Sequence, residues 1–502
     1  MKQSSKILAT IILFFLLGEV SAQVNTYDLN TYKYRYQMYR GLNFYGNFDQ
    51  RGYVNNNIQE NRSNDTTISN LNQNLNNTLD IRANYYSLVN TEALQKNVSS
   101  YANIVGSFNN GSNENIAGSN QYRVPTISTN VGYTESTRKY KSSNVFGYTE
   151  KTGNLNIRQE RQNFKIDGAN EVTQSGWFNS SANISLKKGA GRGRIDHVTD
   201  VVSALFLVED LHEKGLGSAD NNQIEKLAKG ITYINNQRYL DFRFAWIDQI
   251  SMLDSILKEA GISSESELTY FTVLTDNWQN ARRLTRITGN RFTAYYGLDL
   301  DYYNDRQRST YWDLNQPIST FSASRTLYAQ PQLGIDYVSA KQLDQHRQFS
   351  WGGSLSASFI GYVYQSKNAM ELTKNIPKAK YEEDLIFGNN AIKLELYSFV
   401  EWIYQPNSRS YFSLNLSPQA SLTNSAEGID FSGTHITSIN PSLNTSLNYF
   451  RFVNRHINFN INLRSQSTFY EQNNIIKSDV LNVYKQLSHN HTLAFGINYL
   501  LF

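Results

Sequence analysis

The 502-residue chain contains no cysteine and only seven prolines, and charged residues make up only 18% of it. Without cysteine the fold has no disulfide framework. A soluble domain usually carries about 25% charged residues, so this chain owes its polarity mainly to Asn, Ser, Thr and Gln. The net charge of +4 is small for the length and gives no reason to expect nucleic acid as a partner.

Long apolar runs are also missing. Beyond the N-terminus no segment reaches the roughly 20 apolar residues that a membrane-spanning helix needs, which excludes a helical membrane protein. The chain nevertheless has 34 tyrosines and 26 phenylalanines. Disordered chains are poor in aromatic residues, so the sequence predicts a folded protein.

The first 22 residues have the three parts of a secretory signal peptide. Lys2 and Lys6 precede the apolar stretch 7–17, and Ser21 and Ala22 are small residues suited to cleavage. The alternative is an N-terminal membrane anchor, but the apolar stretch is shorter than the roughly 17 residues that span a bilayer. We therefore expect a cleaved signal at 1–22 and a mature chain that begins at Gln23.

Most of the mature chain alternates between apolar and polar residues. In the segment 457–464, isoleucine, phenylalanine and leucine alternate with asparagine and arginine, which is typical of a strand with one apolar face. Segments of about 9–11 residues are long enough to cross a membrane as tilted strands. The same alternation occurs at 42–48, 79–85, 178–186, 292–302, 355–363, 394–404, 412–420 and 439–449.

The strands of a secreted β-sandwich or β-solenoid also alternate. Strand length and the positions of aromatic residues distinguish these folds from a membrane barrel. Sandwich strands are usually about 5–6 residues long, and their outward faces carry many charges. Here the segments are longer, and aromatic residues such as Trp402, Tyr404 and Tyr449 lie near their ends, as in the girdles of membrane barrels. We predict an all-β transmembrane antiparallel β-barrel of about 16 strands, within the range 14–18.

The C-terminus supports the same class. The chain ends in Phe502, and the segment before it alternates, with the apolar row at Leu493, Phe495, Ile497, Tyr499 and Leu501. In these features the chain resembles Gram-negative outer-membrane β-barrel proteins, and its Asn- and Tyr-rich strands are similar to those of Bacteroidota-like bacteria. The resemblance implies an outer-membrane location, outer-membrane lipid around the barrel, and recognition of Phe502 as an assembly signal by the barrel assembly machinery. In that class, however, the apolar row includes the terminal aromatic residue, and here it does not.

One region changes period from two to 3.6, which indicates helices. Four amphipathic helices are expected, around 198–208, 224–234, 240–259 and 268–284, and Ser264 with Glu267 gives a capping box before the fourth. The expected division is 23–188 for the first half of the barrel, 189–287 for a helical insert and 288–502 for the second half. Counting about eight strands on each side places the insert in the periplasm, with an extracellular position or a lumen plug as alternatives.

Few residues have the arrangement of a reactive site. The segment Lys187–Arg194 has glycines at 189, 191 and 193, but Arg194 breaks the spacing of a dinucleotide loop. We interpret it as a flexible hinge whose four cations contact lipid headgroups or an acidic partner surface, with a plain solvated junction as the alternative. His489 and His491 in an expected turn lack a third metal ligand. Asp344, His346 and Ser350 are the only residues that suggest a hydrolase in the barrel wall, and their spacing does not define a catalytic unit. We therefore expect no enzyme, cofactor or metal.

The polar faces lead to the functional hypothesis. If they line a lumen, neutral amides with a few mixed charges would pass or hold polar solutes without strong charge selection. We expect a channel or export conduit for polar solutes or polymers, with the helical insert as plug, gate or docking module for a periplasmic protein. A non-conducting scaffold barrel that binds other envelope proteins is the alternative. The expected lumen-lining residues are Asn440, Asn444, Asn448, Asn458, Asn460, Asn462, Arg464, Glu395, Glu401, Asp299 and Asp301.

Overall fold

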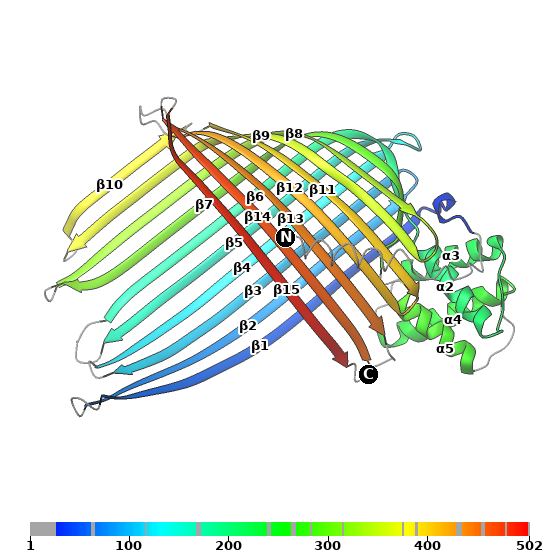
Figure 1. Cartoon of the computed structure of the whole chain (residues 1–502), viewed down its shortest axis with the longest axis horizontal. Coiled ribbons are helices and arrows are strands. Elements are labelled where there is room, and N and C mark those ends of the chain that lie inside the picture. The colour runs from blue at the N-terminus through cyan, green and yellow to red at the C-terminus, as the bar shows by residue number, and fades with distance from the viewer. Residues whose placement is uncertain are drawn as a thin grey trace.

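The computed structural model describes residues 27–61, 66–115, 118–166, 172–237, 242–262, 268–281, 284–313, 316–373, 376–386, 390–427, 434–452, 457–476 and 479–499. The expected signal peptide, the capping box at Ser264 and the assembly signal at Phe502 lie outside these residues. Within them, the chain forms one large antiparallel sheet with four α-helices at one end of it (Figure 1).

Fifteen strands make up the sheet, and each pairs with its neighbour in sequence except at β10. Six strands precede the helices and the others follow them. The strands are β1 (Tyr36–Asn61), β2 (Thr66–Thr91), β3 (Leu94–Asn115), β4 (Gly118–Tyr140), β5 (Val145–Ile166), β6 (Val172–His197), β7 (Ile287–Asp313), β8 (Gln316–Gln342), β9 (Arg347–Thr373), β10 (Ile376–Ile386), β11 (Asn390–Asn407), β12 (Ser410–Glu427), β13 (Thr434–Phe452), β14 (Ile457–Ile476) and β15 (Asp479–Tyr499).

The prediction of an antiparallel β-fold with four helices is confirmed, but the closed barrel is not. The first and last strands of the sheet order, β1 and β15, are not paired with each other in the described part of the chain, so the sheet is open. β10 and β11 both pair with β9, through Ile386 opposite Tyr364 and Asn390 opposite Gly361, and so follow one another along the same edge. Side by side, the sheet therefore has fourteen strand positions.

The expected eight strands before the helices are six. The count fails because β1 to β6 are 22–26 residues long, roughly twice the segment length used for counting. An even number nevertheless precedes the helices. The helices consequently lie at the same end of the sheet as the segment that leads into β1 (Figure 1). This segment consists of a short 3-10 turn, η1 (Leu29–Thr31), and the residues after it.

The sheet is strongly curled. Asn30 donates a hydrogen bond to the carbonyl oxygen of Gln342 on β8 and accepts one from Thr288 on β7, yet β1 begins at Tyr36. Strands lie about 4.8 Å apart, so the seven steps from β1 to β8 measure about 34 Å across a flat sheet. Six extended residues reach at most about 21 Å. The segment can bridge the two strands only because the sheet bends around it.

The two faces of the sheet differ in chemistry. Large apolar side chains are exposed on one face, which we call the apolar face, and they cluster in the part of each strand nearer the helices. Beyond this apolar band the strands continue with polar residues, which explains why they exceed the expected 9–11 residues. Exposed members of the band include Leu42, Phe44, Leu79, Ile104, Ile127, Leu155, Leu186, Leu298, Leu333, Leu355, Leu394, Leu443, Leu463 and Leu493.

The helices form a compact cluster, which we call the helical insert: α2 (Thr199–Glu213), α3 (Asn221–Asn236), α4 (Phe242–Glu259) and α5 (Leu268–Asn280). Asp220 caps α3 in a capping box with Gln223 that the sequence analysis did not identify. The core includes Val202, Leu205, Leu227, Ile231 and Leu274, together with Leu29 and Tyr32 from the N-terminal segment. In the described part of the chain, no helix has both the length and the apolar content to cross a membrane.

Candidate functional site

A continuous row of residues crosses the polar face near the helical insert. Gln37, Asn90 and Gln95 on the first three strands are hydrogen-bonded in series, Asn90 donating to Gln37 over 2.7 Å and Gln95 to Asn90 over 3.0 Å. The first two are 1% exposed. Strand pairing continues the row through Arg138, Tyr148, Gly189, Tyr295, Gly334, Ser356, Glu395, Ser421 and Asn440.

This row shows where the residues expected to line a lumen lie. Glu395 and Asn440 belong to the row. The remaining predicted lumen residues lie on the same face of the sheet, because each is an even number of positions from a row residue on its own strand or is paired with such a residue on the next strand. Asn448 and Asn462 are directly opposite and hydrogen-bonded, and Asn448 donates to Ser413 over 3.2 Å. The side chain of Asn458 is outside the described part. Whether this face lines a water-filled lumen stays a prediction.

An aromatic and charged cluster narrows the polar face where β5, β6 and β7 meet. The rings of Tyr148 and Tyr295 lie 6.4 Å apart, edge to face, above Gly189, which has no side chain to separate them. Lys187 pairs with Glu150 over 3.1 Å and lies 5.2 Å from the ring of Tyr295. The sequence interpretation of Lys187–Arg194 as a flexible hinge is therefore wrong, because these residues are paired on both sides within β6.

A buried ion network joins the N-terminal segment to the sheet. Arg35 binds Asp196 through two hydrogen bonds of 2.9 and 3.0 Å and also contacts Glu92 over 2.6 Å. Arg194 contacts the same Asp196 over 3.0 Å and donates to Asn90 over 2.8 Å. Because β6 continues to His197, the helices begin ten residues beyond the expected domain boundary at 189.

Arg286 is the central residue where the helices join β7. It is fully buried and donates hydrogen bonds to the side chains of Gln342 (2.7 Å) and Gln405 (3.4 Å) and to the carbonyl oxygen of Gln345 (3.2 Å). Burial lowers the pKa of Arg286 to about 10, so it remains charged at neutral pH. Its amide donates to the hydroxyl of Thr199 at the start of α2, which ties both ends of the helical insert together.

The helical insert contacts the end of the sheet at widely separated strands. On α2, Glu209 accepts a hydrogen bond from Gln345 in the β8–β9 turn over 2.8 Å. On α5, Asp276 forms an ion pair with Arg409 in the β11–β12 turn. On α3, Asn236 is hydrogen-bonded to the backbone of β1. Because these contacts are distributed along the sheet order, the helices extend across the end of the curled sheet.

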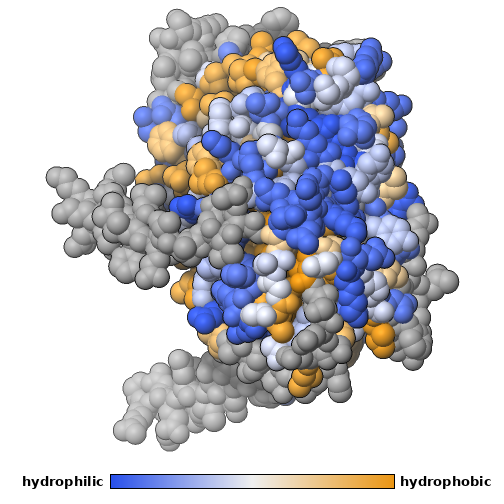
Figure 2. Space-filling view, turned by 90° about the vertical axis from the view of Figure 1, so that its right-hand side faces the viewer, coloured by the Kyte–Doolittle hydropathy of each residue, from blue (hydrophilic) through white to orange (hydrophobic). Residues whose placement is uncertain are grey.

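Seen from that end, the molecule presents a largely hydrophilic surface in the middle of the view, with hydrophobic patches above and below it (Figure 2). A cavity of about 680 Å³ lies between the helices and the first two strands. Its walls combine Tyr39 and Tyr86 from the sheet with Asn235, Gln249 and Gln279 from three helices. Hydroxyl and amide groups predominate, so the cavity suits water or a polar solute more than an apolar ligand.

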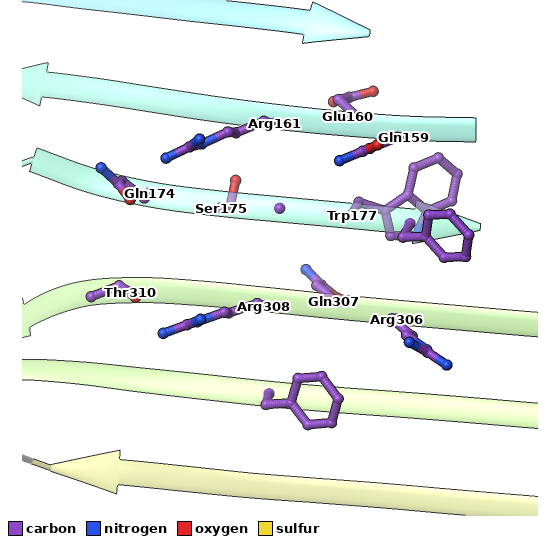
Figure 3. Close-up of a pocket in the computed structure, with 13 residues that line it drawn as sticks. Gln159, Glu160, Arg161, Gln174, Ser175, Trp177, Arg306, Gln307, Arg308 and Thr310 are labelled. Atoms are coloured by element: carbon purple, nitrogen blue, oxygen red, sulfur yellow. The ribbon is translucent and has the colours of Figure 1, made fainter. Parts of the chain in front are cut away.

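A second cavity, of about 390 Å³, lies at the opposite part of the strands (Figure 3). It is bordered by Arg161 on β5, Ser175 and Trp177 on β6, and Arg306 and Arg308 on β7. In the close-up, Arg161 and Arg308 point in the same direction on either side of β6. Three arginines and one glutamate make the walls of this cavity cationic.

The reactive arrangements considered from sequence do not form. His489 and His491 lie within β15 and not in a turn, and the described residues hold no group of three or more His, Cys, Asp or Glu that suits a metal. His346 faces the carbonyl oxygen of Gln405 at 3.0 Å, and the hydroxyl of Ser350 accepts from Gln348 at 3.0 Å. No hydrogen bond between His346 and Ser350 occurs among the described residues, so they do not form a nucleophile–base pair.

A scan against protein-family models finds no match to the chain. A search of curated proteins finds no significant match either. The structure itself is a large, barrel-like antiparallel sheet with a helical cluster at one end.

Proposed function

We propose that the protein is an outer-membrane β-barrel that conducts or exports polar solutes, and that the helical insert is the plug that closes one end of it. The observation that supports this most strongly is the set of contacts from three helices to β1, the β8–β9 turn and the β11–β12 turn. Contacts at three separated places in the sheet order hold the helices across the end of the curled sheet, which is the position that a plug requires.

The two faces of the sheet support the membrane part of the proposal. Exposed leucine, isoleucine and phenylalanine side chains form a band on one face of nearly every strand, and such a band is costly in water unless lipid or protein covers it. On β7 it extends over the eleven residues from Phe292 to Tyr302, which is about 25 Å of membrane thickness for a strand tilted by 45°. This matches the hydrocarbon layer of an outer membrane.

The polar face supports the proposal that the protein conducts or exports polar solutes. A lining of Asn, Ser, Gln and Tyr offers neutral donors and acceptors, and the ion pairs within it, such as Lys187 with Glu150, leave little net charge. The protein would then prefer polar, weakly charged solutes or polymers. The buried row near the helices favours the alternative of a closed scaffold barrel, in which the same polar groups only satisfy one another.

Crosslinking the plug to the sheet tests the proposal. The chain has no cysteine, so Asp276→Cys and Arg409→Cys can be joined specifically by a short bis-maleimide. In planar bilayers the unlinked double variant, which lacks the ion pair, should open more often than the native protein, and crosslinking should suppress the openings. Glu225→Cys with Lys229→Cys, an exposed ion pair within α3, is the matched control. Absence of current in every state would reject the conduit and favour the scaffold.

A further inference from the structure

Five arginines lie on the apolar face just beyond the apolar band, at the end of the strands away from the helical insert. Arg123 on β4 shares its face with Ile127, Arg161 on β5 with Leu155, and Arg325 on β8 with Leu333. Arg306 and Arg308 continue the face of Leu298 and Tyr302 on β7. We call these five residues the arginine band.

The arginine band has no neutralising carboxylates. No described position of the apolar face on β4 to β8 beyond the apolar band is Asp or Glu, and Lys165 adds a further cation. In the described part of the chain none of the five arginines forms an ion pair. Glu160 also borders the cavity of Figure 3, but it lies at the alternate position of β5 and pairs with Arg158 over 3.0 Å. The arrangement therefore concentrates positive charge at one border of the apolar band.

Two of the arginines lie on either side of a gap above Gly176 on β6. Strand pairing places Arg161 opposite Gly176, Gly176 opposite Arg308, and Arg308 opposite Phe321. Gly176 has no side chain, and a Cβ built there would meet nothing within 4 Å. Since alternate strands are about 9.6 Å apart, the two guanidinium groups can approach one oxyanion from both sides. This gap belongs to the 390 Å³ cavity of Figure 3.

The surroundings of the gap are amphipathic. Phe178 and Phe321 border it, and at the edge of the arginine band the guanidinium of Arg123 lies 4.8 Å from the ring of Phe108. Guanidinium groups bind phosphate oxygens in bidentate geometry, and aromatic residues favour the boundary between hydrocarbon and water. A ligand that is anionic at its head and apolar along its body fits this position better than a free anion does.

We infer that the arginine band is a binding site for the phosphate of an anionic lipid headgroup, held between Arg161 and Arg308, in the leaflet away from the helical insert. The inference rests on the proposed membrane location and does not require that the protein conduct. Lipid bound here would anchor β5 to β8, the strands that carry the helical insert between β6 and β7.

Lipid titration of the full chain in neutral detergent, followed by native mass spectrometry, tests the inference. Phosphatidylglycerol should bind more tightly than phosphatidylcholine. Each cation near an anionic lipid surface contributes about fivefold in affinity, so Arg161→Gln with Arg308→Gln should weaken phosphatidylglycerol binding by about 25-fold. Gly176→Leu should weaken it without any change of charge, because the side chain fills the gap. Arg158→Gln, on the opposite face of the same strand, is the control and should leave binding unchanged.

Several results would each overturn the inference. They are equal binding of the two lipids, unchanged binding by the double arginine variant, loss of binding in Arg158→Gln alone, and displacement of phosphatidylglycerol by inorganic phosphate at equal concentration, which would assign the gap to free phosphate. Binding of dextran sulfate at the expense of phosphatidylglycerol would assign the arginine band to an acidic polymer and also contradict it. None of these readouts depends on conductance, so a failed conduit and a failed lipid site are distinguishable.

Discussion

Asn236 occupies the place of a neighbouring strand on the free edge of β1. The amide of Met38 donates to the Oδ1 atom of Asn236 over 2.7 Å, and the Nδ2 atom of Asn236 donates to the carbonyl oxygen of Tyr36 over 2.6 Å. An unpaired edge strand exposes such groups to solvent or to unwanted partners. One side chain of the helical insert thus satisfies two backbone groups where the sheet is open.

Asn236→Ala should detach α3 from β1 without unfolding either. Each of the two hydrogen bonds contributes about 1 kcal/mol, so the population with α3 detached should rise by roughly 30-fold. Hydrogen exchange at the amide of Met38 should accelerate by at least that factor, because the substitution also removes the acceptor of this amide. Asn222→Ala, at an exposed position of the same helix, is the matched control. Unchanged exchange at Met38 would show that Asn236 does not hold the edge.

The contact between α2 and the β8–β9 turn should depend on pH. Burial, with the nearby Asp210 and Glu213, raises the pKa of Glu209 to about 7. Burial also lowers the pKa of His346, whose Nε2 atom lies 3.7 Å from Glu209, so this contact is not a strong ion pair. A carboxyl group whose pKa is raised on folding favours the protonated state, and its stabilising effect is lost as the pH rises.

The loss should occur between the unfolded pKa, about 4.5, and the folded pKa of about 7. Over this window the insert should become less stable by up to about 3 kcal/mol. Glu209→Gln keeps an acceptor for Gln345 and should remove most of the dependence, which limited proteolysis of the insert at several pH values would measure. Glu259→Gln, near the C-terminus of α4, is the control. The same pH profile in Glu209→Gln and in the native protein would contradict the assignment.

Arg286→Met should weaken the junction between the helices and β7 more than most single changes. Methionine fills part of the volume but leaves the side chains of Gln342 and Gln405 without their donor. Each unsatisfied buried group costs about 1–3 kcal/mol, so a loss of several kcal/mol is expected. Arg286→Lys should rescue only partly, since an ammonium group cannot reach acceptors in a planar fork. Heat-induced loss of the compact form, seen as a shift in gel mobility, measures both variants against Arg347→Met, a partly exposed arginine at the start of β9.

The periodicity of the sequence was sufficient to predict the antiparallel β-fold and the four helices, but neither every strand nor the lengths of the strands. Alternation is read reliably where one face is apolar, as at 439–449, and becomes ambiguous beyond the apolar band, where both faces are polar. This is why each named segment covers only part of the strand that contains it, and why no segment was named within β3, β4, β5, β8 or β10. Counting errors followed from that, although the parity of the count before the helices remained even.

The contacts that close one end of the sheet could not be predicted from the sequence, because they join residues that are distant in the chain. Arg35 is far from Asp196 and Arg194 in the chain, and the latter two lie in an apparently irregular segment. Only the curl of the sheet brings the start of β1 close to the end of β6. Glycines at 189, 191 and 193 suggested flexibility, but they lie in a paired strand, and Gly193 adopts a positive φ of 91°. The polar row has no local signal either, because each strand contributes a single residue to it.

Gly334→Val should narrow the polar interior by displacing Tyr295. The two residues are opposite each other, and a Cβ at Gly334 would lie 2.4 Å from the ring of Tyr295, so the ring has to rotate away from the wall. If the polar face lines a conduit, single-channel conductance should fall, and Tyr295→Ala in the same chain should restore it because the displaced ring is gone. Gly153→Val is the matched control, since a Cβ there meets nothing within 4 Å and the position belongs to the apolar face of β5. A fall in conductance that Tyr295→Ala does not reverse would mean that Gly334 acts through the backbone of β8 and not through the ring above it.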